Sequence, residues 1–300
     1  MRSLFPFMIL FLLITVSCKE QSQQTHEEHF RVEKEIHSTH SEAGEVLYSM
    51  LLPTDITTVF NRTGTNYDPT IPAPVKDITL YNEQEQIAVM LGIYGVDITY
   101  MKILEQTLPA AQYYRAIETL SGKAGIPQKI FEESARQLEK HFNNEDSLAS
   151  VIDDIYRKTD RFFRESGKEN LAALSLAGGW VEAMYIGTRI FESDSGNHLM
   201  AEQLLQQKFS LNSIYTLLSN HQESLAVKEY LLMLKKIRKV YDQVEIMYQK
   251  EGFSVDTTRK KIQSYSARIR YDEKTLNELL RVIPLVRDEL ITVKTDKPSA

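Results

Sequence analysis

The chain has 300 residues, with 35 basic against 41 acidic side chains and a formal net charge of −6. This acidic balance argues against a nucleic-acid-binding protein, because such proteins carry a basic patch that neutralises phosphates. The only cysteine is Cys18, which excludes an intrachain disulfide framework. The length is sufficient for a sizeable hydrophobic core in one large domain or two small ones.

Residues 1–17 have the pattern of a secretory signal peptide. Arg2 precedes an apolar run from Leu4 to Val16, which is too short to span a bilayer well. The run ends in Thr-Val-Ser-Cys, which resembles the lipobox of bacterial lipoproteins, with Thr15 where that motif most often has Leu. The resemblance implies that Cys18 is acylated with palmitate-like chains and becomes the mature N-terminus. An ordinary signal peptide followed by an incidental cysteine is the alternative.

Residues 18–40 are polar and are predicted to form a lipidated tether. Lys19 follows the cysteine, where an Asp would resemble an inner-membrane retention signal, so we expect a lipid anchor in the outer membrane of a Gram-negative cell. The tether carries two His-x-x-His pairs, at 26–29 and 37–40. Imidazole suits zinc or nickel, but a flexible linker provides no preorganised geometry. The prediction is therefore a solvated linker with no resident metal or cofactor.

Helix-forming residues dominate the rest of the chain, and glycine and proline are few. This pattern predicts an all-α fold, a multi-helix array with short connections in a single domain over residues 41–293, followed by a disordered tail over 294–300. The prolines and glycine between 62 and 75 predict a long loop. The expected helices cover 41–52, 82–106, 109–122, 127–143, 146–167, 171–192, 198–218, 222–250, 256–270 and 273–292, the last with a kink at Pro284.

The segment from Leu171 to Phe191 is apolar nearly all round and is predicted to be the central helix. Glu182 and Arg189 interrupt it, so a buried core helix is favoured over a membrane span. Small residues recur in it at every fourth position, namely Ser175, Gly179, Ala183 and Gly187. Because glycine costs a helix about 1 kcal/mol relative to alanine, such a row predicts close approach of a second helix. The expected partner has a similar stripe, Ala88, Gly92, Gly95 and Thr99.

The two segments also resemble each other at an offset of 85 positions. Asp97 then matches Glu182, and Tyr100 matches Tyr185, three residues further on in each case. Two explanations are open from the sequence, an old duplication of a helical hairpin and a coincidence between two apolar helices.

Three segments carry a resemblance to a known family. They are LPTDITTVFNRTGTNY at 52–67, LGIYGVDITY at 91–100 and LAGGWVEAMYIGT at 176–188. They resemble an uncharacterised family of helical lipoproteins of the Bacteroidota, over roughly residues 45–250. Thr54 stands where that family commonly has serine, and Ala183 where it commonly has glycine. The resemblance implies a helical fold and a lipoprotein location, and it implies no activity.

Asp97 and Glu182 are the leading candidate functional residues, because each lies inside an apolar helix. A buried carboxylate needs a partner or it takes up a proton. One hypothesis is a polar cleft between the two helices that binds a ligand; the other is an internal ion-pair network that fixes helix register. The candidate ligand-binding set is Asp97, Tyr100, Trp180, Glu182, Tyr185 and Arg189.

Paired carboxylates can act as acid and base in catalysis, yet these two lie in mid-helix. Tyr185 stands where a Glu-x-x-His metal motif would need histidine, and there is no nucleophile elbow, phosphate loop or His-Glu-x-x-His motif. The prediction is therefore no enzyme. The leading interpretation is a lipid-anchored helical binding or scaffold protein of the cell envelope that recognises an envelope protein or a small ligand. The alternatives are a cleft enzyme using Asp97 and Glu182, and a purely structural subunit of an outer-membrane complex.

Two further patterns predict surface features. The aromatic pairs Tyr113–Tyr114 and Phe162–Phe163 lie beside Arg115 and Arg161, which suggests an exposed aromatic cluster. The basic run over 235–239 predicts a solvated helix face, with contact to lipid headgroups as the alternative.

Overall fold

The computed structural model of the chain describes residues 25–35, 66–76, 78–130, 132–133, 136, 158–159, 161–193, 198–249, 254–256 and 261–292. The predicted signal peptide, Cys18, the helix expected over 41–52 and the tail over 294–300 lie outside the described residues.

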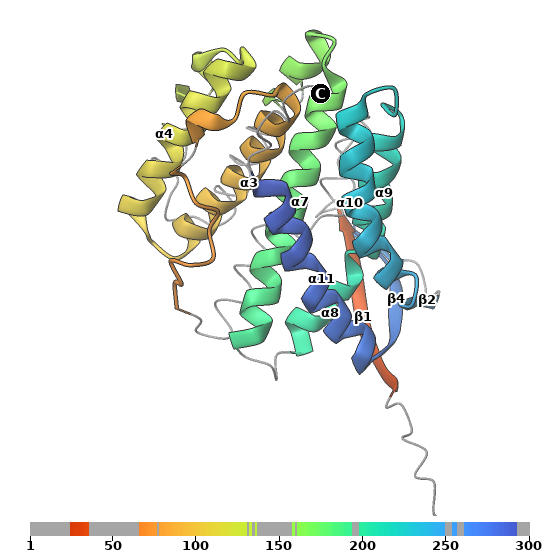
Figure 1. Cartoon of the computed structure of the whole chain (residues 1–300). Coiled ribbons are helices and arrows are strands. Elements are labelled where there is room, and N and C mark those ends of the chain that lie inside the picture. Colours follow the sequence, from red (N-terminus) through yellow and green to blue (C-terminus); the bar gives the residue numbers. More distant parts are fainter. Residues whose placement is uncertain are drawn as a thin grey trace, which may run out of the picture.

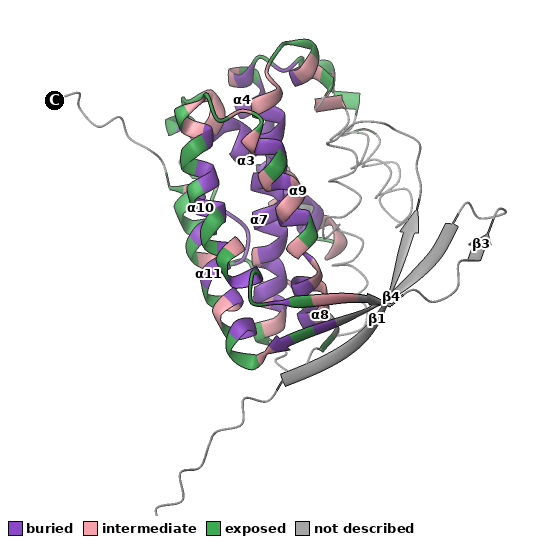
Figure 2. Ribbon diagram, turned by 90° about the vertical axis from the view of Figure 1, so that its right-hand side faces the viewer, coloured by how far each residue is buried: buried purple, intermediate pink, exposed green. Residues whose placement is uncertain are grey.

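The predicted helical array is confirmed. One long helix, α7 (Glu169–Ser193), occupies the centre and packs against five others (Figures 1 and 2). Buried residues concentrate on α7 and its neighbour α3 (Figure 2). The remaining helical elements are α3 (Gln84–Ile103), α4 (Thr107–Ala124), α8 (His198–Gln206), α9 (Lys208–Ser219), α10 (Leu225–Tyr241), α11 (Glu273–Ile291) and the short 3-10 helix η1 (Ile78–Leu80).

Capping residues in the sequence determine where several helices begin or end. The hydroxyl of Ser224 caps α10 by accepting from the backbone N–H of Val227, and Asp272 caps α11 by accepting from Thr275 N–H at 2.6 Å. Gly125 ends α4 with φ of 75°, a left-handed conformation that a side chain would strain. Pro284 lies inside α11.

Backbones of α3 and α7 touch where the sequence places small residues. A Cβ atom on Gly92 would stand 1.9 Å from the carbonyl oxygen of Ser175 and 2.8 Å from Gly179 N, and one on Gly178 would stand 2.4 Å from Val89 O. The predicted close approach is therefore confirmed. The two helices run in the same direction, because Asp97 meets Glu182 further along both of them (Figure 1).

A four-stranded antiparallel sheet was not predicted. Its strands are β1 (Thr25–Glu35), β2 (Glu245–Gln249), β3 (Ser254–Asp256) and β4 (Lys261–Asp272), and β4 pairs with each of the other three. The helix predicted over 256–270 is thus wrong, and the helix predicted over 222–250 ends at Tyr241. Ile269 and Tyr271 are buried while Arg270 between them is exposed, which is the two-residue alternation of a strand. Strand β1 lies within the segment predicted to be a tether.

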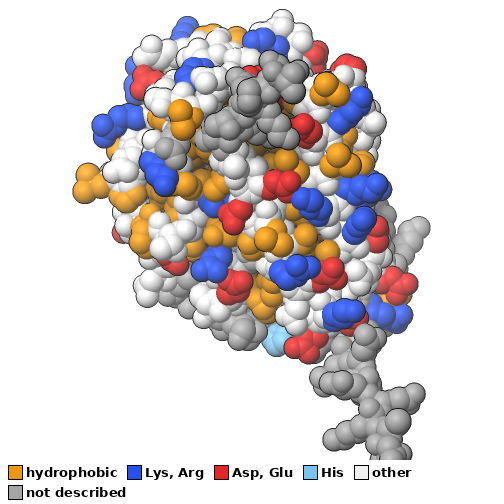
Figure 3. Space-filling view, in the orientation of Figure 1, with side chains coloured by type: hydrophobic (Ala, Val, Ile, Leu, Met, Phe, Trp, Pro, Cys, Tyr) orange, Lys and Arg blue, Asp and Glu red, His pale blue; other side chains and the backbone are white. Residues whose placement is uncertain are grey.

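The helix predicted over 198–218 is interrupted at Gln207, which separates α8 from α9. The side chain of Gln207 is buried and accepts a hydrogen bond from the indole N–H of Trp180 at 3.4 Å. In the described part of the chain, no helix has the length and apolar character needed to cross a membrane. The face seen in Figure 3 intersperses hydrophobic side chains with basic and acidic ones.

Replacing Gly92 by alanine is expected to destabilise the fold by about 1–3 kcal/mol, because the new methyl group must displace the backbone of α7. Gly122 is the matched control: it is an exposed helical glycine of α4, and a methyl group added there would meet no other atom within 4 Å. Gly122→Ala is expected to stabilise by up to about 1 kcal/mol. Urea denaturation followed by circular dichroism measures both changes. Equal effects of the two substitutions would contradict the close packing of α3 on α7.

Candidate functional site

The two candidate carboxyl groups meet at the α3–α7 interface, and neither side chain is exposed to solvent. Asp97 comes from α3 and Glu182 from α7, where the two helices continue beyond their glycine contact. The two acids therefore turn toward each other. Two negative charges at this depth would cost far more than the protein's net stability, so the site needs a cation, a proton or both.

Arg287 of α11 supplies the cation. Its Nε donates to Glu182 Oε2 at 2.9 Å and its Nη2 to Glu182 Oε1 at 3.0 Å, which is the two-pronged geometry that suits guanidinium and carboxylate. The guanidinium lies 4.4 Å from the ring centre of Tyr185, so it also stacks on an aromatic face. Burial alone would lower the pKa of Arg287, but the adjacent Glu182 outweighs it and raises that pKa above its ordinary value.

A proton on Asp97 neutralises the second carboxyl group. Burial and the neighbouring Glu182 raise the pKa of Asp97 well above its ordinary value. Its Oδ2 accepts from the backbone N–H of Ala73 at 3.0 Å, while no donor among the described residues reaches Oδ1. A proton on Asp97 allows that carboxyl group to donate to Glu182, its hydrogen-bonding neighbour. One cation and one net negative charge then balance.

An irregular segment, residues 66–76, covers this network; we call it the strap. Ile71 and Ala73 of the strap are buried. Arg287 Nη2 donates to Ile71 O at 3.1 Å, and Asp97 accepts a hydrogen bond from the N–H of Ala73. The acids are therefore sealed beneath backbone, which favours the internal-network interpretation over an open cleft.

Tyrosine hydroxyl groups form hydrogen bonds with the backbone of the strap. Tyr113 donates to Ala73 O at 2.6 Å and Tyr94 donates to Pro74 O at 3.0 Å. The hydroxyl of Tyr100 accepts from the N–H of Asp68 at 3.2 Å. These bonds satisfy backbone groups that an irregular segment cannot pair with itself. Burial raises the pKa of Tyr100 to about 12, so the hydroxyl keeps its proton at neutral pH.

The sequence-predicted set is only partly brought together. Asp97, Glu182 and Tyr185 belong to the network, and Tyr100 holds the strap beside it. The indole of Trp180 instead bonds to Gln207, at the junction of α8 and α9. The expected place of Arg189 in this set is corrected, because its side chain is partly exposed and pairs with Glu192 on the same helix.

Arg287 was missed because it lies far along the chain from both acids. The sequence pattern nevertheless indicates that Arg287 is buried. It follows Ile283 by four residues and precedes Leu290 by three, and both are buried, so it occupies the apolar face of α11. The predicted aromatic surface cluster is also corrected, because Tyr113 and Phe163 are buried in the core.

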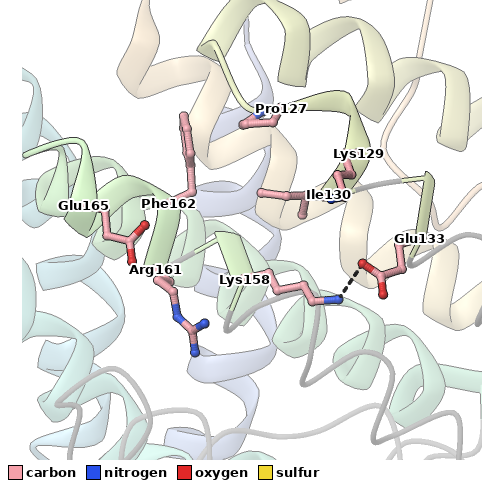
Figure 4. A pocket seen from close by; sticks show the side chains of 8 residues that line it. All are labelled: Pro127, Lys129, Ile130, Glu133, Lys158, Arg161, Phe162 and Glu165. Carbon is pink, nitrogen blue, oxygen red and sulfur yellow. Dashed lines mark ion pairs between the residues drawn. The ribbon is translucent and has the colours of Figure 1, made fainter.

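A pocket of about 330 Å³ lies elsewhere on the molecule, between residues 127–130 and 133 on one side and the helical residues 158 and 161–165 on the other (Figure 4). Pro127, Ile130 and Phe162 form the apolar part of its wall. The size is at the lower end of the range for small-molecule sites.

Charged side chains of both signs surround the apolar wall of this pocket. Lys158 pairs with Glu133 at 3.4 Å across it, and Lys129, Arg161 and Glu165 also line it. Figure 4 shows these groups contributed by the two facing segments. The pocket therefore offers an apolar contact flanked by ionic groups that solvent can reach.

Asp97→Asn is expected to preserve the fold, because the amide can accept from Ala73 N–H and donate to Glu182 as a protonated acid does. The pKa of Asp97 is raised by folding, so the native state binds the extra proton and stability falls as pH rises above about 4, the unfolded value. The variant should therefore gain stability over the parent between pH 4 and 8, by up to about 1.4 kcal/mol per pH unit. Urea denaturation measures the free energy of unfolding of both proteins across this pH range. If the two values change with pH in parallel, Asp97 is not protonated in the parent.

Arg287→Met is expected to cost about 3–5 kcal/mol at pH 7, because two buried carboxyl groups lose their cation. The cost should shrink toward pH 4, where protonated carboxyl groups need no cation. Arg189→Met is the matched control and should change stability by less than about 0.5 kcal/mol, since its ion pair is exposed. Thermal unfolding of the two variants at both pH values compares them; similar losses would refute the network.

No protein-family model, curated protein or solved structure matches the chain. Its function is therefore inferred from its own residues.

Proposed function

We propose that the protein is a lipid-anchored helical binding module of the Gram-negative cell envelope, held to the outer membrane through Cys18. The observation that supports a binding role over catalysis is the burial of Asp97 and Glu182. Both side chains are shielded from solvent beneath the strap, and their oxygens are taken up by Arg287, Ala73 and each other. A cleft enzyme using this pair would have to expel the strap to admit a substrate.

The binding surface in this proposal is the pocket between residues 127–130 and 133 on one side and residues 158 and 161–165 on the other. Its apolar wall, formed in part by Ile130 and Phe162, would receive an apolar group of the ligand or of a partner protein. Lys129 and Arg161 would pair with an acidic group beside it. Burial of an apolar anchor with charged groups at the rim is the usual arrangement of a recognition site.

The network beneath the strap contributes rigidity to such a module. It joins the strap, α3, α7 and α11 through bonds to buried groups, so the helices cannot slide without breaking an ion pair. A rigid body loses little conformational entropy when it binds, which favours affinity. The structural-subunit alternative shares this rigidity and differs in having no ligand in the pocket.

Lipidation at Cys18 is tested by metabolic labelling with a palmitate analogue in a Gram-negative host. The chain should incorporate the label, and Cys18→Ser should not, because no second thiol exists in the sequence. The mature protein should fractionate with the outer membrane. Equal labelling of the parent and the serine variant, or none of either, would refute the anchor.

The pocket is tested by cross-linking and recovery from detergent-solubilised envelopes. Arg161→Glu should lose the recovered component, because it places a negative charge where the proposed acidic group binds. Arg115→Glu is the control: it makes the same charge change at an exposed site on α4. Thermal unfolding should show that both variants stay folded. Equal recovery with both variants would place the binding surface elsewhere.

A further inference from the structure

The solvent-facing side of α10 carries leucines and lysines in one row. Leu225, Lys228, Leu232, Lys235 and Lys239 follow one another at spacings of three or four residues, which keeps them on a single helix face. All five are exposed, and the leucines are 76% and 63% exposed. We call this row the Leu–Lys stripe. Figure 3 views the molecule from the side on which α10 and α11 lie, and there basic, acidic and hydrophobic side chains are mixed.

The lysines of the stripe differ from the other cations of α10. Lys236 lies at the seam with α11, where it pairs with Glu289, and Arg238 stacks on Tyr215 at 4.6 Å. Among the described residues, no carboxylate forms an ion pair with Lys228, Lys235 or Lys239. Three positive charges therefore stand together in the row, on a chain whose formal net charge is −6, and the exposed acids Glu229 and Asp242 lie beside the row.

We propose that the Leu–Lys stripe docks α10 flat on an anionic phospholipid surface. This inference rests on the proposed envelope location, which would bring the stripe near a membrane. A helix of this length extends over about 25 Å. Its two leucines would enter the boundary between headgroups and acyl chains, and the lysine stems would lie along that boundary with their ammonium groups at the phosphates.

Charge and apolar contact contribute separately to this docking. A lysine near an anionic leaflet strengthens binding by roughly fivefold, so three lysines contribute about a hundredfold. The leucines add a part that does not depend on salt. Together they would supply the second contact that a lipid-anchored protein needs for a fixed orientation, with α10 against the bilayer.

Vesicle co-sedimentation of the unacylated chain from Lys19 to Ala300, which contains every described residue, tests the stripe apart from the anchor. The parent should bind vesicles of phosphatidylcholine and phosphatidylglycerol and should bind pure phosphatidylcholine roughly a hundredfold more weakly. Lys228→Glu/Lys235→Glu/Lys239→Glu should reduce binding to the anionic vesicles at least as much. Failure of the parent to bind them would overturn the proposal.

A second triple variant separates the stripe from net charge. Lys76→Glu/Arg115→Glu/Arg136→Glu makes the same charge change at exposed positions away from α10 and should keep most of the binding. Equal loss in both triple variants would overturn the proposal. Leu225→Ser/Leu232→Ser should weaken binding severalfold and leave its salt dependence unchanged. Unchanged binding of this leucine variant would likewise overturn it. Because no acyl chain is present, the result is independent of whether Cys18 is lipidated.

Discussion

Two buried carboxyl groups and one buried cation must reach charge neutrality without solvent. This requirement constrains the rest of the fold. Arg287 pairs with Glu182 through two hydrogen bonds, and Asp97 beside them keeps a proton. Every group in this set comes from a different helix. Other bonds go to the backbone of the strap, and Arg287 Nη1 also donates to the exposed Asp288 at 3.5 Å. The desolvation of these groups is compensated only when all of the elements are in place, so the network favours a single arrangement of the helices.

The close contact of α3 with α7 makes that network possible. Gly92 and Gly178 bring the two backbones together, and a turn further along each helix the acids meet. The helices run in the same direction, and Asp97 and Glu182 are the positions that match when the two segments are offset by 85 residues. Two copies of one helical unit related by local symmetry would place matching residues together in this way.

Sequence patterns predicted the parts of the molecule that depend on neighbours along the chain. The apolar run of α7 and the small-residue stripe at Gly92 each have a local cause, and both are found. Arg189 was included in the candidate set because a single sequence reveals same-helix spacing only. Arg287, the ion partner of Glu182, is brought in by tertiary packing. The sheet was missed because β4 is rich in polar and basic residues, and its short alternation at Ile269 is decided by pairing with other strands. The pocket has no local motif, because two separate segments form it.

Carbon-13 NMR of the protein labelled at aspartate side-chain carboxyl carbons tests the central claim most directly. The account predicts one aspartate resonance that keeps the shift of a protonated acid at neutral pH and is missing in the spectrum of Asp97→Asn. A spectrum in which the Asp97 resonance moves to the ionised position near its ordinary pKa would show that two buried negative charges face one arginine, and the account of the fold's centre would be wrong.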